Sequence, residues 1–322
     1  MDGVSCMALT AASSKEFKRD YFVKSKDASY LQEFLIKLSI FIYVPVLFLN
    51  TIFTSRDRNS ITKGKKNMTG KVNVSSAKNI DMQELKDLSK KIGVTVNDVL
   101  MCATTTALKE YFRIRGDKLG DAEVEGSTPP MIQVLLPANI RFRWYPTADD
   151  VSCENKFAAL PVKLPIIANM KDSYKPTSKI TKKLKGNIGY IYAAYAVTYL
   201  VNIFGCRFIP RFFLHKASMK FTLSISNTPG PVKSFIFDHE NGEQSFYRWC
   251  QSYVMVAGRV GMCVSAMSYD KTFRICVTAD EAVCQDTKFL VDKIRSNIQS
   301  EIERMRDTKV PEALQLGSKK EN

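Results

Sequence analysis

Four short stretches of this 322-residue sequence combine amide, carboxylate, glycine and proline residues in patterns that suggest a site for chemistry. Each stretch is a weak signal alone, and their joint occurrence in one order makes them informative. They are Asp2-Gly3, followed by Val4-Ser5-Cys6-Met7-Ala8-Leu9; Asn97-Asp98 at the head of a predicted helix; Leu136-Pro137-Ala138-Asn139-Ile140-Arg141, with Asn155 and Leu160-Pro161 beyond it; and Ser226-Asn227-Thr228-Pro229-Gly230-Pro231 after a predicted strand.

Local structure explains two of these stretches in part. Asp98 lies three residues after Thr95, so the two can form a helix N-cap, with Asn97 in the first turn. Capping and the shaping of an active site are compatible roles. The Pro229-Gly230-Pro231 sequence is more typical of a turn that fixes a loop than of a catalytic site.

The residues that most often supply a base or bind a metal are scarce. His215 lies in an apolar and basic segment and is expected to be structural, whereas His239 is expected in a solvent-facing turn. Neither has a motif that would make it a catalytic base. The eight cysteines contain no C-x-x-C pair, so no zinc site is expected; they are predicted to be buried hydrophobes in a reducing compartment.

In order and approximate spacing, the four stretches resemble the wax ester synthase/diacylglycerol acyltransferase family. Its catalytic motif is His-His-x-x-x-Asp-Gly, usually continued by Val-Ser-Gly-Met-Ala-Leu. Asp2 and Gly3 match the end of that motif, and Cys6 replaces the usual glycine of the continuation. Asn97-Asp98 matches the family's Asn-Asp motif, and the stretch that begins at Ser226 matches Ser-Asn-x-Pro-Gly-Pro.

This resemblance implies an α/β (α+β) fold like that of chloramphenicol acetyltransferase, a two-layer sandwich in two similar domains with a tunnel between them. The second histidine of the pair would act as general base on the hydroxyl of diacylglycerol or a long-chain alcohol. That hydroxyl would attack the thioester of fatty acyl-CoA, the co-substrate; no permanently bound cofactor and no metal are implied.

The resemblance also implies roles for residues of this chain. Asp2 would hold the catalytic loop in shape, and Gly3 would leave room beside the base. Asn97 and Asp98 would shape the active site. The structural motif would consist of Ser226, Asn227, Pro229, Gly230 and Pro231.

The histidine pair itself would lie just before Met1. We therefore expect the chain to be the C-terminal part of such an enzyme, truncated within the motif and unable to esterify an alcohol alone. The alternative is a non-catalytic relative that binds lipid or a membrane.

The elements that must position these residues follow from the sequence pattern. Asp81 and Glu84 predict the start of a helix that Gly93 ends, and Thr95 begins the next one. Strands are predicted at 71–76, 131–136, 156–164, 220–225, 253–257, 262–267 and 273–278. A last helix from about Asp286 has an inward stripe of Val291, Ile294, Ile298, Ile302 and Met305. The mixed order of strands and helices favours an α/β or α+β domain.

Two apolar segments, 31–53 and 188–213, leave alternatives open. Pro45 would kink a helix in the first, whose uninterrupted apolar part of roughly 16 residues is short of the ~20 needed to cross a bilayer. This segment can be a buried helix, an interfacial membrane helix or a span. We predict an N-terminal remnant (1–55, with the apolar helix 31–53), a linker (56–70), the C-terminal acyltransferase domain (71–310) and a disordered tail (311–322).

The net charge of +15 favours an anionic partner such as coenzyme A or an anionic lipid surface. Nucleic acid is not expected, because no recognition motif is present. The basic run 171–185 can be a solvated face or, with the adjacent apolar helix, a membrane-docking face. We expect the protein at a membrane or lipid-droplet surface, on the cytosolic side of the endoplasmic reticulum. The acceptor, the acyl-chain length and the oligomeric state do not follow from the sequence.

Overall fold

The structure is a computed structural model that describes residues 29–121, 128–139, 157–204, 215–230, 236–238, 244–246 and 259–307. Its helices are α2 (Tyr30–Phe53), α3 (Ser60–Gly64), the 3-10 turn η2 (Lys65–Asn67), α4 (Met82–Ile92), α5 (Val96–Ile114), α6 (Lys118–Asp121), α7 (Met170–Gly186), α8 (Ile188–Phe204) and α10 (Thr287–Asp307). Its strands are β1 (Val72–Ser76), β2 (Ile80–Asp81), β3 (Met131–Asn139), β4 (Phe157–Pro165), β5 (Leu223–Thr228), β6 (Ile236–Asp238), β7 (Gln244–Phe246), β8 (Met262–Tyr269) and β9 (Thr272–Asp280).

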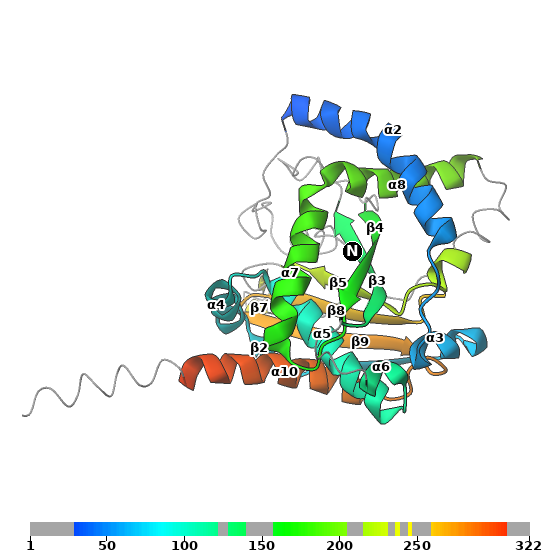
Figure 1. Cartoon of the computed structure of the whole chain (residues 1–322). Coiled ribbons are helices and arrows are strands. Elements are labelled where there is room, and N and C mark those ends of the chain that lie inside the picture. Colours follow the sequence, from blue (N-terminus) through cyan, green and yellow to red (C-terminus); the bar gives the residue numbers. More distant parts are fainter. Residues whose placement is uncertain are drawn as a thin grey trace, which may run out of the picture.

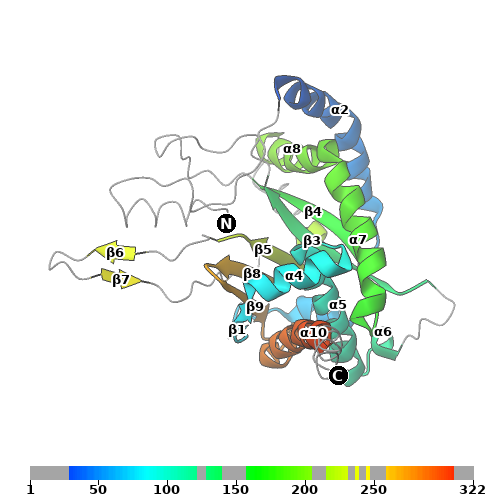
Figure 2. The same ribbon diagram turned by 90° about the vertical axis from the view of Figure 1, so that its left-hand side faces the viewer.

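A mixed seven-stranded sheet forms the centre of the molecule (Figure 1). Its strand order is β1-β9-β8-β5-β3-β4, with β2 added to β9. Strands β3, β5 and β8 run parallel to one another, and the remaining pairs are antiparallel. The carboxyl ends of the three parallel strands therefore point to the same edge of the sheet. The hairpin β6–β7 stands away from this sheet (Figure 2).

Helix α5 is the central helix of the helical layer. It is buried on nearly every side from Asp98 to Phe112, as expected for a helix covered by neighbours all round. Helix α10 packs against it with the predicted inward stripe, in which Ile294, Ile298 and Ile302 have no exposed surface. Helix α7 packs on α5 as well, so α5 lies in contact with α10, α7 and the sheet.

Capping residues define the beginning and the end of α4 and the beginning of α5, as the sequence predicts. Asp81 accepts hydrogen bonds from the backbone N–H groups of Gln83 and Glu84, and Gly93 ends α4 with the left-handed φ of 78°. A side chain at Gly93 would be strained in that conformation. The predicted boundaries of α4 and the start of α5 at Thr95 are confirmed.

Strands β2, β6 and β7 were not predicted, β8 and β9 are longer than predicted, and two further strands have other bounds. Strand β3 continues through Pro137 to Asn139; this costs no bond to β5, because β5 pairs only with Val134 and Leu135 of β3. Strand β5 covers Leu223–Thr228 rather than 220–225. The predicted strand 253–257 lies outside the described residues.

The basic stretch that the sequence predicts as a linker, 56–70, contains α3 and η2 and packs into the body. The side chains of Asn59, Ile61, Thr62 and Lys65 have no exposed surface. Side-chain hydrogen bonds inside this stretch, including the capping box of Asn59 and Thr62, give it regular structure despite its polar composition. The position of a domain boundary here remains a prediction.

Helices α2 and α8 pack on each other at the top of the molecule (Figures 1 and 2). Large apolar side chains on the outer side of α2 are exposed in this structure, and its inner side packs on α8. The three alternatives for 31–53 remain predictions. Within the part of the chain that the structure describes, no helix is both long and apolar enough to span a membrane.

Candidate active site

The amino-terminal end of α5 presents the Asn97-Asp98 pair. Asp98 accepts hydrogen bonds at Oδ2 from the backbone N–H and the hydroxyl of Thr95, both at 2.8 Å, and completes the predicted capping box. Its other oxygen, Oδ1, accepts a 2.6 Å hydrogen bond from the Thr181 hydroxyl of α7. Asp98 is almost fully buried, so its role is to fix the start of α5 against α7.

Asn97 points away from this buried network and toward the sheet. Its Oδ1 accepts a hydrogen bond from Nδ2 of Asn227, near the end of β5. Two motifs that lie 130 residues apart in sequence are therefore joined by their amide side chains. Asn97 is exposed and Asn227 half-buried, so both amides retain groups that can bind a ligand.

The turn after β5 is held tightly against β8. The Gly230 N–H donates a 3.1 Å hydrogen bond to the hydroxyl of Ser268, and a Cβ at Gly230 would collide with the Ser268 carbonyl oxygen. Within the same motif, Ser226 is buried and lies opposite Ser265 of β8. The architectural role of this stretch stays a prediction; Pro231 lies outside the described residues.

The third motif lies at the same edge of the sheet. Leu136 pairs with Leu160 and Pro137 with Ala159, so the two parts of this motif are neighbours in the antiparallel pair β3–β4. Strand β3 leaves β5 after Leu135, whereas β5 stays with β8 up to Thr228. Carboxyl ends of parallel strands that separate in this way are the usual place for ligands in open α/β sheets.

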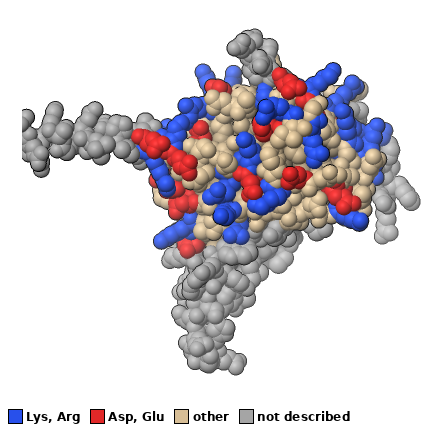
Figure 3. Space-filling model, turned by 90° about the horizontal axis from the view of Figure 1, so that it is seen from below, with Lys and Arg blue, Asp and Glu red and all other residues tan. Residues whose placement is uncertain are grey.

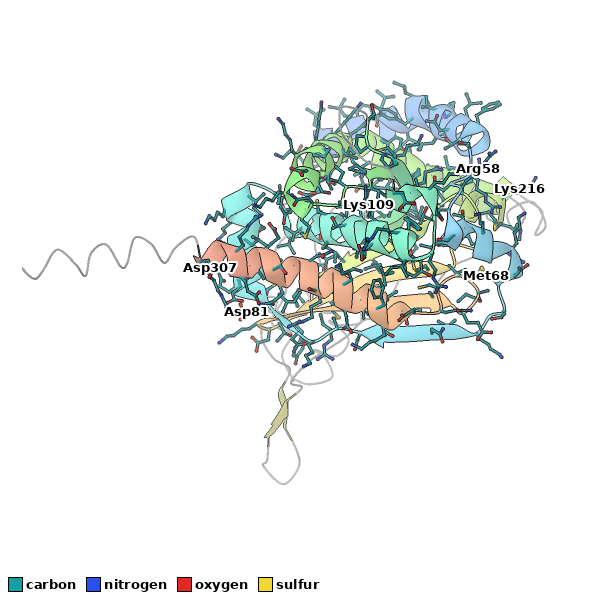
Figure 4. The ribbon with its side chains drawn as sticks, turned by 60° about the horizontal axis from the view of Figure 1, so that its bottom comes forward. Arg58, Met68, Asp81, Lys109, Lys216 and Asp307 are labelled. Carbon is teal, nitrogen blue, oxygen red and sulfur yellow. The ribbon has the colours of Figure 1, made fainter. Side chains whose placement is uncertain are left out.

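Several predicted site residues cannot be placed. Asp2, Gly3, Ile140, Arg141, Asn155 and His239 lie outside the described residues. His215 is described and exposed; it precedes β5, whereas Asn227 is near the end of that strand. The neighbouring Lys216 lies at the end of the molecule that also carries Arg58 and Met68 (Figure 4). His215 is thus not at the motif-bearing edge.

The buried cysteines are poor nucleophiles. Burial raises the pKa of both Cys102 and Cys263 to about 11, so both are thiols at neutral pH. Cys276 and Cys284 are also free and buried. These four fit the predicted role as small core residues, and the other four cysteines lie outside the described residues.

The opposite edge of the sheet has a buried polar network that the sequence did not indicate. Asp57 accepts hydrogen bonds from the Thr222 hydroxyl (2.6 Å) and from the backbone N–H of Gln133 (2.6 Å). Nearby, the ammonium group of Lys65 donates to the backbone carbonyls of Ser218 (3.3 Å) and Phe221. The hydrogen-bond partners of Asp57 and Lys65 lie more than 70 residues away in the sequence. Local sequence patterns therefore could not predict this network.

Comparison with known proteins gives the motifs their context. Residues 153–301 match the WS/DGAT C-terminal domain. The similarity to this family model thus covers just under half of the chain. Members of this family are O-acyltransferases, and the predicted resemblance is confirmed.

The chain is also similar to wax ester synthase/diacylglycerol acyltransferase 8 of Arabidopsis thaliana. It is 21% identical over an alignment of 275 residues, and the match covers 79% of this chain and 54% of the relative. The chain thus spans about half the length of this WS/DGAT relative.

Solved structures confirm the fold. The wax ester synthase/diacylglycerol acyltransferase from Marinobacter aquaeolei VT8 matches with a TM-score of 0.50 and 15% identity, over 94% of this chain and 64% of that one. The epimerization domain of the third module of tyrocidine synthetase B also matches with a TM-score of 0.50 and 15% identity, over 94% of this chain and 67% of that domain. The mixed α/β fold predicted from the WS/DGAT motifs is therefore confirmed over most of the chain.

Proposed function

We propose that this WS/DGAT chain carries the acyl-CoA-facing part of an O-acyltransferase of neutral lipid synthesis. The acceptor would be diacylglycerol, giving triacylglycerol, or a long-chain alcohol, giving a wax ester. The observation that carries this proposal is the hydrogen bond between Asn97 and Asn227, which brings two family motifs to the carboxyl edge of the parallel strands.

The reaction is a transfer of one acyl group. A base takes the proton of the acceptor hydroxyl, the alkoxide oxygen attacks the thioester carbonyl, and a tetrahedral oxyanion forms. Collapse of that intermediate breaks the C–S bond and releases coenzyme A, which takes up the proton. By resemblance to the family, the base is a histidine of the His-His-x-x-x-Asp-Gly motif, whose last two positions match Asp2 and Gly3.

Asn97 and Asn227 suit a positioning role beside this reaction. The amide pair leaves N–H and C=O groups free to bind the polar part of an acyl-CoA or the thioester carbonyl. The hydrogen bonds of Asp98 with Thr95 and Thr181 fix the start of α5, which carries Asn97. The alternative function is a non-catalytic relative that binds acyl chains or lipid without transferring them.

Binding of acyl-CoA to the purified chain tests the proposal. We expect palmitoyl-CoA to bind more tightly than coenzyme A or palmitate alone in equilibrium dialysis. Asn227→Ala should weaken that binding by roughly threefold to tenfold, as expected for the loss of one or two hydrogen bonds. Asn67→Ala, an exposed asparagine of η2, is the matched control and should leave binding unchanged.

Two outcomes separate the alternatives. Binding of palmitate that equals or exceeds binding of palmitoyl-CoA, unchanged in Asn227→Ala, would support the non-catalytic lipid-binding function. Absence of acyl-CoA binding by a folded chain would contradict the proposed acyltransferase function.

A further inference from the structure

Apolar side chains on the outer side of helix α2 have no partner element among the described residues. Of the sixteen large hydrophobic side chains that are exposed in this part of the chain, ten lie on α2. They are Tyr30, Leu31, Phe34, Leu35, Leu38, Phe41, Ile42, Val46, Leu49 and Phe53. At about 100° per residue, these ten positions fall within one arc of about 160°. We call this arc the α2 face, and none of its ten residues is charged.

The other side of α2 is fixed to the body of the molecule by α8. Leu47 is buried, and Tyr43 packs edge-to-face on Tyr190 of α8. A Cβ at Gly189 would collide with the Ser39 hydroxyl, so the two helices approach each other closely at the first turn of α8. Both views place α2 at the outer boundary of the molecule (Figures 1 and 2). The α2 face is therefore held in a fixed orientation, facing outward.

The opposite end of the molecule has the composition of an ordinary solvent-facing surface. Seen from below, it carries lysine and arginine interspersed with aspartate and glutamate (Figure 3). On α10, Lys288 pairs with Asp292, and Arg304 pairs with Glu301. An apolar patch as long as the α2 face is rare on monomeric soluble proteins and marks an interaction site.

The composition of α2 favours burial against protein. Helices that lie on a membrane surface have a strongly charged side, rich in lysine and arginine, opposite their apolar side. Helix α2 contains only two charged residues, Glu33 and Lys37, and no basic residue in its last turn. The side opposite the α2 face is the contact with α8. A helix that is apolar on nearly every side is typical of a buried position.

The spacing within the α2 face suits contact with another helix. A stripe of its residues recurs at steps of three and four: Leu31, Leu35, Leu38, Ile42, Val46, Leu49 and Phe53. Such steps keep the stripe nearly parallel to the helix axis, so a second helix can pack along its whole length. Ile42 is the midpoint of the stripe, because eleven positions separate it from Leu31 and eleven from Phe53.

The area of the α2 face is large enough for a stable dimer. Its ten side chains are about half to four-fifths exposed, and together they present roughly 1,000 Å² of surface. A specific interface of standard size buries about 800 Å² per partner. A second copy of the chain supplies an identical apolar stripe, so its composition matches that of the first across a twofold axis.

We propose that the α2 face is an interface between two copies of this chain, in which the two α2 helices pack antiparallel about a twofold axis near Ile42. In this arrangement Ile42 lies against Ile42 of the partner subunit, and Leu31 lies against Phe53 of the partner subunit. Each copy buries the α2 face that the single chain exposes. The inference concerns assembly, and it stands or falls independently of the proposed acyl transfer.

Sedimentation of the purified chain at micromolar concentration tests the dimer. We expect the unchanged chain to sediment as a dimer. Phe41→Asp should weaken the dimer at least about tenfold, because it places a charge in the apolar centre of the interface. Ile114→Asp is the matched control, since it changes an exposed apolar residue at the end of α5 and should leave the dimer intact. Circular dichroism melts should show that both variants are folded.

Cysteine cross-linking tests the antiparallel arrangement. Ile42→Cys should form a disulfide-linked dimer on mild oxidation, because the twofold axis brings position 42 against itself. Leu31→Cys alone and Phe53→Cys alone should not cross-link, whereas a mixture of the two should. The unchanged chain, treated in the same way, gives the background from its own eight cysteines.

Several results would overturn the proposal. One is an unchanged chain that sediments as a monomer; flotation of that monomer with vesicles, lost in Phe41→Asp, would assign the α2 face to lipid. Others are a Phe41→Asp chain that dimerises like the unchanged one, or Leu31→Cys that cross-links alone as readily as Ile42→Cys. A dimer that becomes a monomer when the N-terminal part of a WS/DGAT relative is joined to the chain would assign the face to that part.

Discussion

The paired motif residues Asn97 and Asp98 separate into two roles in the structure. Asp98 is buried and holds the start of α5 to Thr95 and α7, whereas Asn97 is exposed and bonds to Asn227. The sequence predicted the capping role from spacing alone, because a cap is a local interaction. The bond to Asn227 could not be predicted, since it depends on how β5 is placed relative to α5.

Lys65 is buried, which is unusual for a lysine. Its side chain has no exposed surface, and this burial lowers its pKa from 10.5 to about 7, although the nearby Asp57 acts in the opposite direction. In the unfolded chain the group keeps a pKa near 10.5, so between pH 7 and that value the unfolded state binds more protons than the folded state. The free energy of unfolding must therefore rise with pH in this window.

We predict that Lys65→Met removes this rise. For the unchanged chain, Lys65 contributes a slope of up to about 1.4 kcal/mol per pH unit between pH 7 and 9, measured by urea unfolding. The slope should vanish below the folded pKa, where the lysine is charged in both states. Lys66→Met, at the exposed neighbouring lysine, should keep the slope; equal slopes in both variants would show that Lys65 does not titrate in the folded state.

At the scale of elements, the hydrogen bond from the Gly230 N–H to Ser268 holds the turn after β5, the strand that carries Asn227, against β8. We predict that Gly230→Ala lowers the free energy of unfolding by about 1–3 kcal/mol, because its Cβ would press on the backbone carbonyl of Ser268. The same substitution should weaken acyl-CoA binding through displacement of Asn227. Urea unfolding and equilibrium dialysis measure the two effects.

Gly186→Ala is the matched control for this prediction. Gly186 is the last residue of α7, and a Cβ there would meet no atom within 4 Å. This substitution should leave stability unchanged or raise it by a few tenths of a kcal/mol, because alanine favours the helix. A Gly230→Ala chain as stable as Gly186→Ala would mean that the turn is not held tightly against β8.

Helix ends that depend on capping residues nearby in the sequence were predicted correctly. The structure of segments that depend on contacts with residues far along the chain was not predicted. Asp81, Gly93 and Thr95 fix helix ends through hydrogen bonds within four residues, and these ends were confirmed. The stretch 56–70 looked like a linker because its composition is polar and basic. Its structure depends on Thr222 and Gln133, far along the chain, which satisfy the polar groups of Asn59 and Asp57.

At the scale of the whole molecule, the described elements form a mixed sheet with α5, α7 and α10 on it and the α2–α8 pair at one end. Of the motif residues that the structure describes, Asn97, Pro137 and Asn227 lie at the carboxyl edge of the parallel strands. The polar network of Asp57 and Lys65 lies at the other edge. The sequence predicted the fold class through its family motifs. It did not predict that α2 would present a continuous apolar face, since the pattern of 31–53 was compatible with three placements.

The most direct test of the account joins this chain to the N-terminal part of a WS/DGAT relative that ends in the His-His-x-x-x of the family motif, fused immediately before Asp2. Radiolabelled palmitoyl-CoA is supplied with dioleoylglycerol or hexadecanol, and the neutral lipid products are separated. We predict that the fusion forms triacylglycerol or wax ester, that Asn227→Ala lowers the rate about tenfold through poorer positioning, and that the chain alone forms neither product. A folded fusion that binds palmitoyl-CoA yet esterifies neither acceptor, while the unmodified relative does, would contradict the proposed acyl transfer.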